Sequence, residues 1–319
     1  MISVKNLTKR YAGVLAVDNL SFEIEKGRVI GFLGPNGAGK TTTMRILTCY
    51  QPPTSGVAQV AGFDVMRESL EVRRRIGYLP ESVPLYPEMR VEEYLDFRAR
   101  LKGVPPSLRR RRIDTCIDRC GLGPVRRRIV GQLSKGFRQR VGFAEAMVHD
   151  PPILILDEPT IGLDPVQIRQ IRTLIKELGR DHTVILSTHI LPEVEMVCDR
   201  VIIIARGRIV AEEATKNLSR VFSTSNRVLL EVRAPQGEVE AGVMALPGVR
   251  AVSLRGVSDD GQYTAVRVET DGPRDRREEL HRLAVEKGWA VRELALDQVS
   301  LEEIFVQVTS APPSESKAG

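Results

Sequence analysis

Short runs of almost wholly apolar residues recur along the first two thirds of the chain. Four of them stand at 29–33, 153–156, 183–187 and 201–205. Such continuous runs are typical of strands buried on both faces, as in a parallel sheet covered by helices. Two other segments, Ile2–Val4 and Ser21–Glu25, alternate apolar and polar residues, which indicates antiparallel strands with one solvated face. The pattern predicts an α/β domain that carries an antiparallel β subdomain.

A helical period replaces the strand pattern between Val91 and about Ala146. We therefore expect a helical insert in the strand-rich domain, over about residues 85–146. Another helix is predicted after Asp164, because aspartate is a favourable N-cap residue and Pro165 suits the first helical position.

The last third of the chain, over residues 223–310, shows a different order of elements. The expected order is strand, helix, strand, strand, helix and strand, at 227–232, 237–246, 249–254, 263–269, 275–287 and 290–295. This order suits a small α+β ferredoxin-like domain. We expect Leu301–Phe305 to form a short closing helix and residues 311–319, rich in Pro and Ser, to form a flexible tail.

A glycine-rich segment follows the first apolar run and matches the phosphate-binding pattern G-x-x-x-x-G-K-[ST]. Its residues are Gly34, Pro35, Asn36, Gly37, Ala38, Gly39, Lys40, Thr41 and Thr42. The strand before it and the helix start after it supply the context that the pattern requires. Backbone N–H groups and the helix dipole would bind a polyphosphate, Lys40 would bridge the β- and γ-phosphates, and Thr41 would bind Mg²⁺. The alternative is a glycine-rich loop that only turns the chain.

Polar residues with catalytic potential stand where two of the apolar runs end. Asp157 and Glu158 follow the run at 153–156, and His189 follows the run at 183–187. Open α/β sheets bind ligands at the carboxyl ends of their strands. Adjacent carboxylates are costly to leave unpaired, and a bound Mg²⁺ would compensate their charge. The alternatives are a turn-capping aspartate and a structural histidine.

Composition is that of a globular protein, with 42% hydrophobic and 28% charged residues. The apolar runs are far shorter than the ~18 residues that cross a bilayer, and no secretory signal is evident, so we expect a cytoplasmic protein with reduced cysteines.

A net charge of +6 is concentrated in the arginine runs 73–75, 109–112 and 126–128. Because no aromatic residues interleave them, solvated faces are favoured over a nucleic-acid site.

Taken in order, these features resemble the nucleotide-binding subunits of ABC transporters over about residues 1–220. The resemblance rests on the phosphate loop, the acidic strand, the histidine, Gly162–Asp164 and a signature-like Leu133–Phe137. It implies an ABC-type ATPase that holds ATP and Mg²⁺ between two subunits arranged head to tail. Ser134 and Gly136 of one subunit would bind the ATP held by the other.

The resemblance also implies roles for single residues. Asp157 would help to hold Mg²⁺, Glu158 would polarise the attacking water, and His189 would contact the γ-phosphate. Asp164 would lie in a loop that crosses to the opposite subunit. Tyr11 would stack on the adenine.

Some positions depart from the family pattern. Glu81 stands where a glutamine is usual, and its carboxylate can still reach Mg²⁺ or water but lacks the amide donor. Lys135 and Phe137 replace the usual glycine and glutamine of the signature. In both departures the chain resembles subunits that pair with ABC-2 permeases.

These observations predict an ATP-hydrolysing subunit that energises a separate ABC-2 type permease for export of an unknown substrate. It would act as a homo- or heterodimer on the cytosolic face of the membrane, with the helical insert as the docking surface for the permease. A soluble ABC-type ATPase that acts on nucleic acid or the ribosome is the alternative, which the single cassette disfavours. A regulatory subunit with little turnover is disfavoured by the intact Lys40, Asp157, Glu158 and His189.

Overall fold

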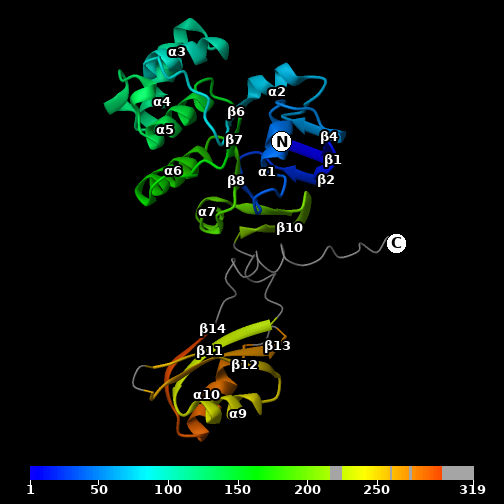
Figure 1. Ribbon diagram of the computed structural model, residues 1–319, viewed down its shortest axis with the longest axis vertical. Coiled ribbons are helices and arrows are strands. Elements are labelled where there is room, and N and C mark those ends of the chain that lie inside the picture. The colour runs from blue at the N-terminus through cyan, green and yellow to red at the C-terminus, as the bar shows by residue number, and fades with distance from the viewer. Residues whose placement is uncertain (216–224, 259–260, 273–274, 297–319) are drawn as a thin grey trace. The chain divides into compact units, whose positions relative to one another are not determined.

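The computed structural model describes residues 1–215, 225–258, 261–272 and 275–296 (Figure 1). The described residues form two compact units, one within residues 1–215 and one within residues 225–296. Each unit has its own hydrophobic core. The predicted closing helix at 301–305 and the tail at 311–319 lie outside the described residues.

A six-stranded sheet forms the centre of the first unit, in the order β10-β9-β3-β8-β7-β6. Its strands are β3 (Val29–Leu33), β6 (Ile76–Leu79), β7 (Ile153–Asp157), β8 (Thr183–Thr188), β9 (Arg200–Ala205) and β10 (Arg208–Ala214). All neighbours are parallel except β9 and β10. Every residue of β3, β7 and β8 is buried, which confirms the prediction from the apolar runs. Because these three strands are adjacent and parallel, their carboxyl ends meet at one edge.

An antiparallel sheet of order β2-β1-β4-β5 packs on the same core. Its strands are β1 (Ile2–Tyr11), β2 (Val14–Ile24), β4 (Ser55–Val60) and β5 (Phe63–Asp64). The first two are longer than the alternating segments predicted, and Tyr11 is the last residue of β1 rather than part of a connection. Register shifts in β1, with Asn6 at φ 52°, interrupt the alternation and conceal the full length of the strand.

Helices surround the central sheet of the first unit. They are α1 (Lys40–Leu47), α2 (Ser69–Arg75), α3 (Val91–Leu101), α4 (Pro106–Arg119), α5 (Lys135–Met147), α6 (Pro165–Leu178) and α7 (Leu191–Val197), with 3-10 turns at Gly123–Val125 and Val130–Gln132. In Figure 1, α3, α4 and α5 gather to one side as the expected helical insert. The fully buried Tyr94 of α3 donates its hydroxyl to Glu145 of α5, which also pairs with Arg98. Buried polar contacts therefore join the helices of the insert.

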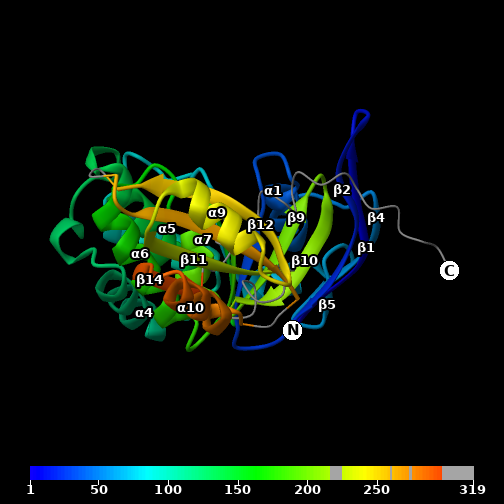
Figure 2. The ribbon, with the colours of Figure 1, turned by 90° about the horizontal axis from the view of Figure 1, so that it is seen from below.

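The second unit contains a four-stranded antiparallel sheet and two helices. Its elements are β11 (Ser225–Arg233), α9 (Gln236–Met244), β12 (Val249–Val257), β13 (Thr264–Asp271), α10 (Arg277–Glu286) and β14 (Ala290–Leu296), with sheet order β12-β13-β11-β14. Both helices cover the same face of the sheet (Figure 1, Figure 2). Alternate residues of β11 and β13 face them, and Val228, Leu230, Val266 and Val268 are fully buried. The predicted order of elements agrees with the structure.

None of the helices that the structure describes is long and apolar enough to cross a membrane.

Candidate active site

The loop from Gly34 to Gly39 joins β3 to α1 at the edge where the buried strands end. A Cβ atom on Gly34 would lie 2.4 Å from the carbonyl oxygen of Ile204. Gly39 has a φ of 102°, and a Cβ there would lie 2.4 Å from the carbonyl oxygen of Ala16. Larger side chains are therefore excluded at both ends of the loop. No side chain caps α1, so its first N–H groups are available to an anion.

Lys40 is buried and directs its ammonium group back into the loop. Its Nζ donates to the carbonyl oxygens of Gly34 and Pro35 at 2.8 and 3.2 Å. The same nitrogen lies 3.2 Å from Oε1 of Glu158, whose side chain is also buried. A buried cation and a buried carboxylate thus neutralise each other across the carboxyl ends of β3 and β7.

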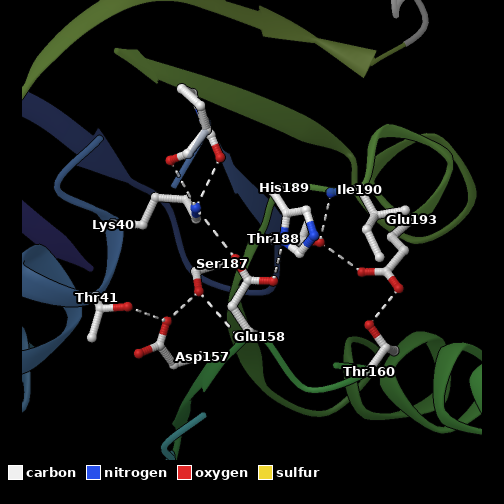
Figure 3. A network of polar contacts seen from close by, with 12 residues as sticks. Lys40, Thr41, Asp157, Glu158, Thr160, Ser187, Thr188, His189, Ile190 and Glu193 are labelled. Carbon is white, nitrogen blue, oxygen red and sulfur yellow. Dashed lines mark hydrogen bonds and ion pairs between the residues drawn. The ribbon is translucent and has the colours of Figure 1, made fainter. Parts of the chain in front are cut away.

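Glu158 connects this lysine to the predicted histidine. Its Oε2 lies 2.9 Å from Nδ1 of His189, so that Lys40, Glu158 and His189 form one chain of polar contacts (Figure 3). The backbone N–H of Glu158 donates to the carbonyl oxygen of Ser187 at 3.1 Å. Glu158 has a φ of 48°, a conformation that costs a non-glycine residue about 1–3 kcal/mol. The fold therefore holds this carboxylate in place at an energetic cost, as is common at functional sites.

Asp157 lies beside the chain of contacts and faces the start of α1. The hydroxyl of Thr41 donates to its Oδ1 at 3.2 Å, and the hydroxyl of Ser187 donates to the same oxygen. Burial raises the pKa of Asp157 above its ordinary value, because these hydrogen bonds offset only part of the desolvation. Oδ2 is buried and lacks a hydrogen-bond partner within the described part of the chain. Such an oxygen suits a metal ligand.

Glu81 shares a cavity of about 460 Å³ with Thr41 and Asp157. The cavity runs from these residues toward the helical insert. The structure therefore brings the three predicted metal ligands to one space. Tyr11 stands apart from them, is 39% exposed, and donates its hydroxyl to Oε1 of Gln51 at 2.7 Å.

The signature-like residues contact a different part of the cassette. Ser134 is the N-cap of α5 and accepts a hydrogen bond from the N–H of Phe137 at 3.4 Å. A Cβ on Gly136 would lie 2.4 Å from Oε1 of Gln167 in α6. Asp164 caps α6, as predicted, with its Oδ1 accepting from the N–H groups of Val166 and Gln167 at 2.9 Å. These contacts connect the signature to α6 and not to the phosphate loop.

Four polar residues around the site were not identified from the sequence. Ser187, Thr188, Thr160 and Glu193 are buried among the strand ends. Ser187 and Thr188 could have been suspected, because they end an apolar run immediately before His189. Nothing in the local sequence separates Glu193 from its exposed neighbour Glu195.

Comparison with known proteins agrees with this geometry. Residues 17–161 match the ABC transporter family. The chain is 34% identical to the bacitracin transport ATP-binding protein BcrA of Bacillus licheniformis, over 97% of each protein. It is 35% identical to the daunorubicin/doxorubicin resistance ATP-binding protein DrrA of Streptomyces peucetius, over 98% of this chain and 94% of that protein. The similarity thus includes the C-terminal third.

Solved structures extend the comparison to the fold of the first unit. An ATP-binding subunit of an ABC transporter aligns with a TM-score of 0.64 and 29% identity, over 70% of this chain and 93% of that one. The dimeric bacterial ABC transporter cassette MJ0796 aligns with a TM-score of 0.62 and 29% identity, over 67% of this chain and 99% of that one. The near full-length similarity agrees with the phosphate loop and the acidic strand found in the sequence. The chain therefore belongs to the ABC transporter ATP-binding proteins and is an ATPase subunit that energises an export-type membrane permease.

Proposed function

We propose that this protein hydrolyses MgATP on the cytosolic face of the membrane to drive a separate ABC-2 type permease. The observation that carries the proposal is the chain of contacts from Lys40 through Glu158 to His189, next to a phosphate loop. The full-length relatives serve bacitracin transport and daunorubicin resistance, which supports an export role here. The cargo would be selected by the permease.

The buried ion pair suggests how ATP prepares the site for hydrolysis. Lys40 Nζ now has Glu158 as its only carboxylate partner among the described residues. A γ-phosphate bound by the loop would replace Glu158 beside this ammonium group. Glu158 Oε1 would then be free to accept a proton from the attacking water, while His189 orients the carboxylate through Oε2 or contacts the phosphate.

The donor set beside the phosphate loop fits Mg²⁺. The Thr41 hydroxyl, Oδ2 of Asp157 and the carboxylate of Glu81 are hard oxygen ligands that border one cavity, and this Oδ2 has no hydrogen-bond partner among the described residues. When bound with ATP, the ion would neutralise charge that develops on the transferred phosphate. The Ser187 hydroxyl would keep Asp157 oriented from the side opposite Thr41.

We further propose that two cassettes complete each site head to tail. Ser134 and Gly136 begin α5, a helix of 13 residues whose N-terminus favours an anion. Within one chain these residues contact α6, so a second subunit is needed to bring them to the phosphates. Asp164, in the adjoining loop, would meet the opposite subunit, and Tyr11 would stack on the adenine. The dimeric MJ0796 cassette supports this arrangement.

The cavity beside Glu81 is proposed as the docking site for the permease. Its basic end is lined by Arg73, Arg98 and Lys102, and both arginines lie close enough to the lysine to interact with it electrostatically. Arg98 forms an ion pair with Glu145, and the same carboxylate attracts the half-buried Lys102. Burial lowers the pKa of Lys102. Arg98 and Lys102 thus share one carboxylate, and Arg73 adds to the excess of positive charge at this end, so we propose that a permease segment inserts a carboxylate here.

The C-terminal unit is proposed to be a ferredoxin-like accessory domain of residues 223–310, following an ATP-binding domain of residues 1–220. Its order of elements and its sheet order support this assignment.

An ATPase directed at nucleic acid gains no support from the arginine runs. Several of their members are paired with acids: Arg74 and Arg75 with Glu71, Arg112 with Asp150, and Arg126 with Glu92 and Asp114.

Replacing Glu158 by Gln tests the proposed catalysis. Loss of a general base lowers turnover by about 10²–10⁴-fold, so we expect at least a hundredfold fall in kcat with MgATP binding retained. Steady-state hydrolysis and equilibrium nucleotide binding by the purified full-length chain provide the measurement. Glu177→Gln, an exposed acid on α6, is the matched control. Unchanged kcat in Glu158→Gln would refute the assigned role.

A further inference from the structure

Glu193 is an unusually buried carboxylate in the short helix α7. It is 1% exposed, although it lies only four residues beyond His189. No role in phosphate or metal binding follows from its position, because its contacts are with other side chains of the protein. Burial of a carboxylate is costly unless hydrogen bonds and charge compensate it, so its contacts identify what it stabilises.

The two carboxylate oxygens of Glu193 bind two different segments, the end of β8 and the connection between β7 and α6 (Figure 3). Thr188 Oγ1 donates to Oε2 at 2.8 Å, and Thr160 Oγ1 donates to Oε1 at 2.5 Å. Arg172 of α6 lies 3.7 Å from Oε1 and supplies the compensating charge. One side chain therefore joins the end of β8, the connection between β7 and α6, and α6 itself.

Both threonines are adjacent to proposed catalytic residues. Thr188 ends β8 directly before His189, its Oγ1 accepts from the N–H of Ile190 at 3.0 Å, and its carbonyl oxygen accepts from the N–H of Gly34 at 3.3 Å. Thr160 lies two residues after Glu158, on the connection that leads to α6. Glu193 therefore fixes the distance between the segments that carry His189 and Glu158.

We propose that Glu193 is a positioning residue for ATP hydrolysis. By holding Thr160 and Thr188 together, it keeps His189 Nδ1 within 2.9 Å of Glu158 Oε2. Through Thr188 it also connects the histidine loop to the first residue of the phosphate loop. This inference rests on the proposed roles of Glu158 and His189, and it adds a residue that acts on them without touching the nucleotide.

Glu193→Gln keeps the shape of the side chain but removes its charge and one hydroxyl acceptor. Loss of a residue that orients catalytic groups typically costs 10- to 100-fold in activity, so we expect kcat to fall by about that factor while the KM for ATP changes less than about twofold. Glu195→Gln is the matched control, since Glu195 is an exposed acid on the same helix. Equal kcat in Glu193→Gln and Glu195→Gln overturns the proposal.

If Glu193→Gln does not fold, a second pair of variants tests the hydrogen bond between Thr160 and Glu193. Thr160→Val removes only the hydroxyl, and Thr160→Ser keeps it. We expect kcat to fall in Thr160→Val and to be largely recovered in Thr160→Ser, with equal melting temperatures. Equal kcat in the two variants would contradict the role of this hydrogen bond.

A double-mutant cycle identifies the residues through which Glu193 acts. In a His189→Ala background, Glu193→Gln should lower kcat by less than about twofold, because coupled residues are not additive. Full additivity would overturn the proposal. Glu158→Gln, measured alongside, separates the two hypotheses: if it retains turnover the proposed catalytic role fails, and if it alone is inactive only the role of Glu193 fails.

Discussion

Single residues of the candidate site are held in place by burial and mutual neutralisation. Lys40 and Glu158 are each about 5% exposed and lie within 3.2 Å of one another. Breaking a buried pair by removing one partner typically costs about 3–5 kcal/mol, whereas an incoming phosphate exchanges one anion for another. Glu158 therefore holds Lys40 in an orientation toward the phosphate loop.

A half-buried histidine near the insert gives the protein a pH-dependent stability. His149 Nε2 lies 3.0 Å from the carbonyl oxygen of Ile76, and burial lowers the pKa of His149 to about 4. The positive charge of Lys102 lowers this pKa further, while Asp150 and the carbonyl oppose the shift. The pKa of His149 in the folded protein lies below the unfolded value of 6.5. The contribution of neutral His149 to the free energy of unfolding is therefore fully present above pH 6.5 and is lost as the pH falls toward 4.

His149 is expected to lower the free energy of unfolding by about 2 kcal/mol between pH 7 and pH 5, in addition to the effects of other titrating groups. Denaturant unfolding of the full chain at both pH values measures it. In His149→Gln this part of the pH dependence should disappear, and His281→Gln, an exposed histidine on α10, should leave it unchanged. An identical pH dependence in His149→Gln and the parent protein would contradict the prediction.

At the level of elements, the proposed docking cavity lies between α1, α2 and α3. Arg45 belongs to α1, Arg73 to α2 and Arg98 to α3, and Lys102 is the C-cap of α3. Thr41 and Asp157 line the same cavity. A segment that binds the basic end would therefore contact helices of both the insert and the central domain, next to the proposed metal ligands. Motion of the insert could reach the active site by this route.

Reversing charge at the basic end should separate the protein from its permease. We expect Arg73→Glu combined with Lys102→Met to lower recovery of a membrane protein with the tagged chain by about tenfold or more, since charge complementarity at such an interface is lost. ATP hydrolysis by the isolated chain should stay within about twofold of the parent. The matched control is Arg110→Glu with Arg111→Glu, on the exposed surface of α4. Undiminished recovery in the first variant would exclude this docking site.

In the whole molecule, the two units have separate cores. The C-terminal core includes Val228, Leu230, Val268 and Trp289, and it contains no residue of the cassette. Trp289 donates its indole N–H to Glu238 of α9 at 3.2 Å, which joins the end of α10 to the other helix of the unit. Each unit therefore has the packing that independent unfolding requires.

Calorimetry of the full chain should show two unfolding transitions, one for each unit. MgADP at about 100 times its Kd should stabilise the cassette transition by about 2.7 kcal/mol and leave the other unmoved. Val268→Ala, which truncates a core residue of the C-terminal unit, should lower only the second transition, by about 2 kcal/mol. A single transition that responds to both MgADP and Val268→Ala would show that the units unfold together.

Local patterns of the sequence determined the strands, the phosphate loop and one helix cap. The runs at β3, β7 and β8 are expected to be buried on both faces, because polar side chains occur only at their ends. Glycine is required at positions 34 and 39, because backbone atoms lie too close there for a Cβ atom. Asp164 suits the start of α6, because its carboxylate accepts from N–H groups that have no partner within the helix. The strands and the cap depend on residues a few positions apart, and the loop matches a known sequence pattern, so the sequence alone reveals them. The contacts that exclude a Cβ at Gly34 and Gly39, in contrast, involve the distant Ile204 and Ala16.

Only the tertiary structure decided how the distant parts meet. The strands β4 and β5 and the helices α2 and α7 were not predicted, because they are short and their apolar faces are defined by the core they join. The sequence placed Lys40, Glu158 and His189 at strand ends, but their mutual distances follow from the strand order β3-β8-β7. Glu193 differs from Glu195 only by the side of α7 that it occupies. Its burial comes from packing of α7 against Thr188 at the end of β8 and against Thr160, which lies 33 residues away in the sequence, and no local pattern encodes this packing.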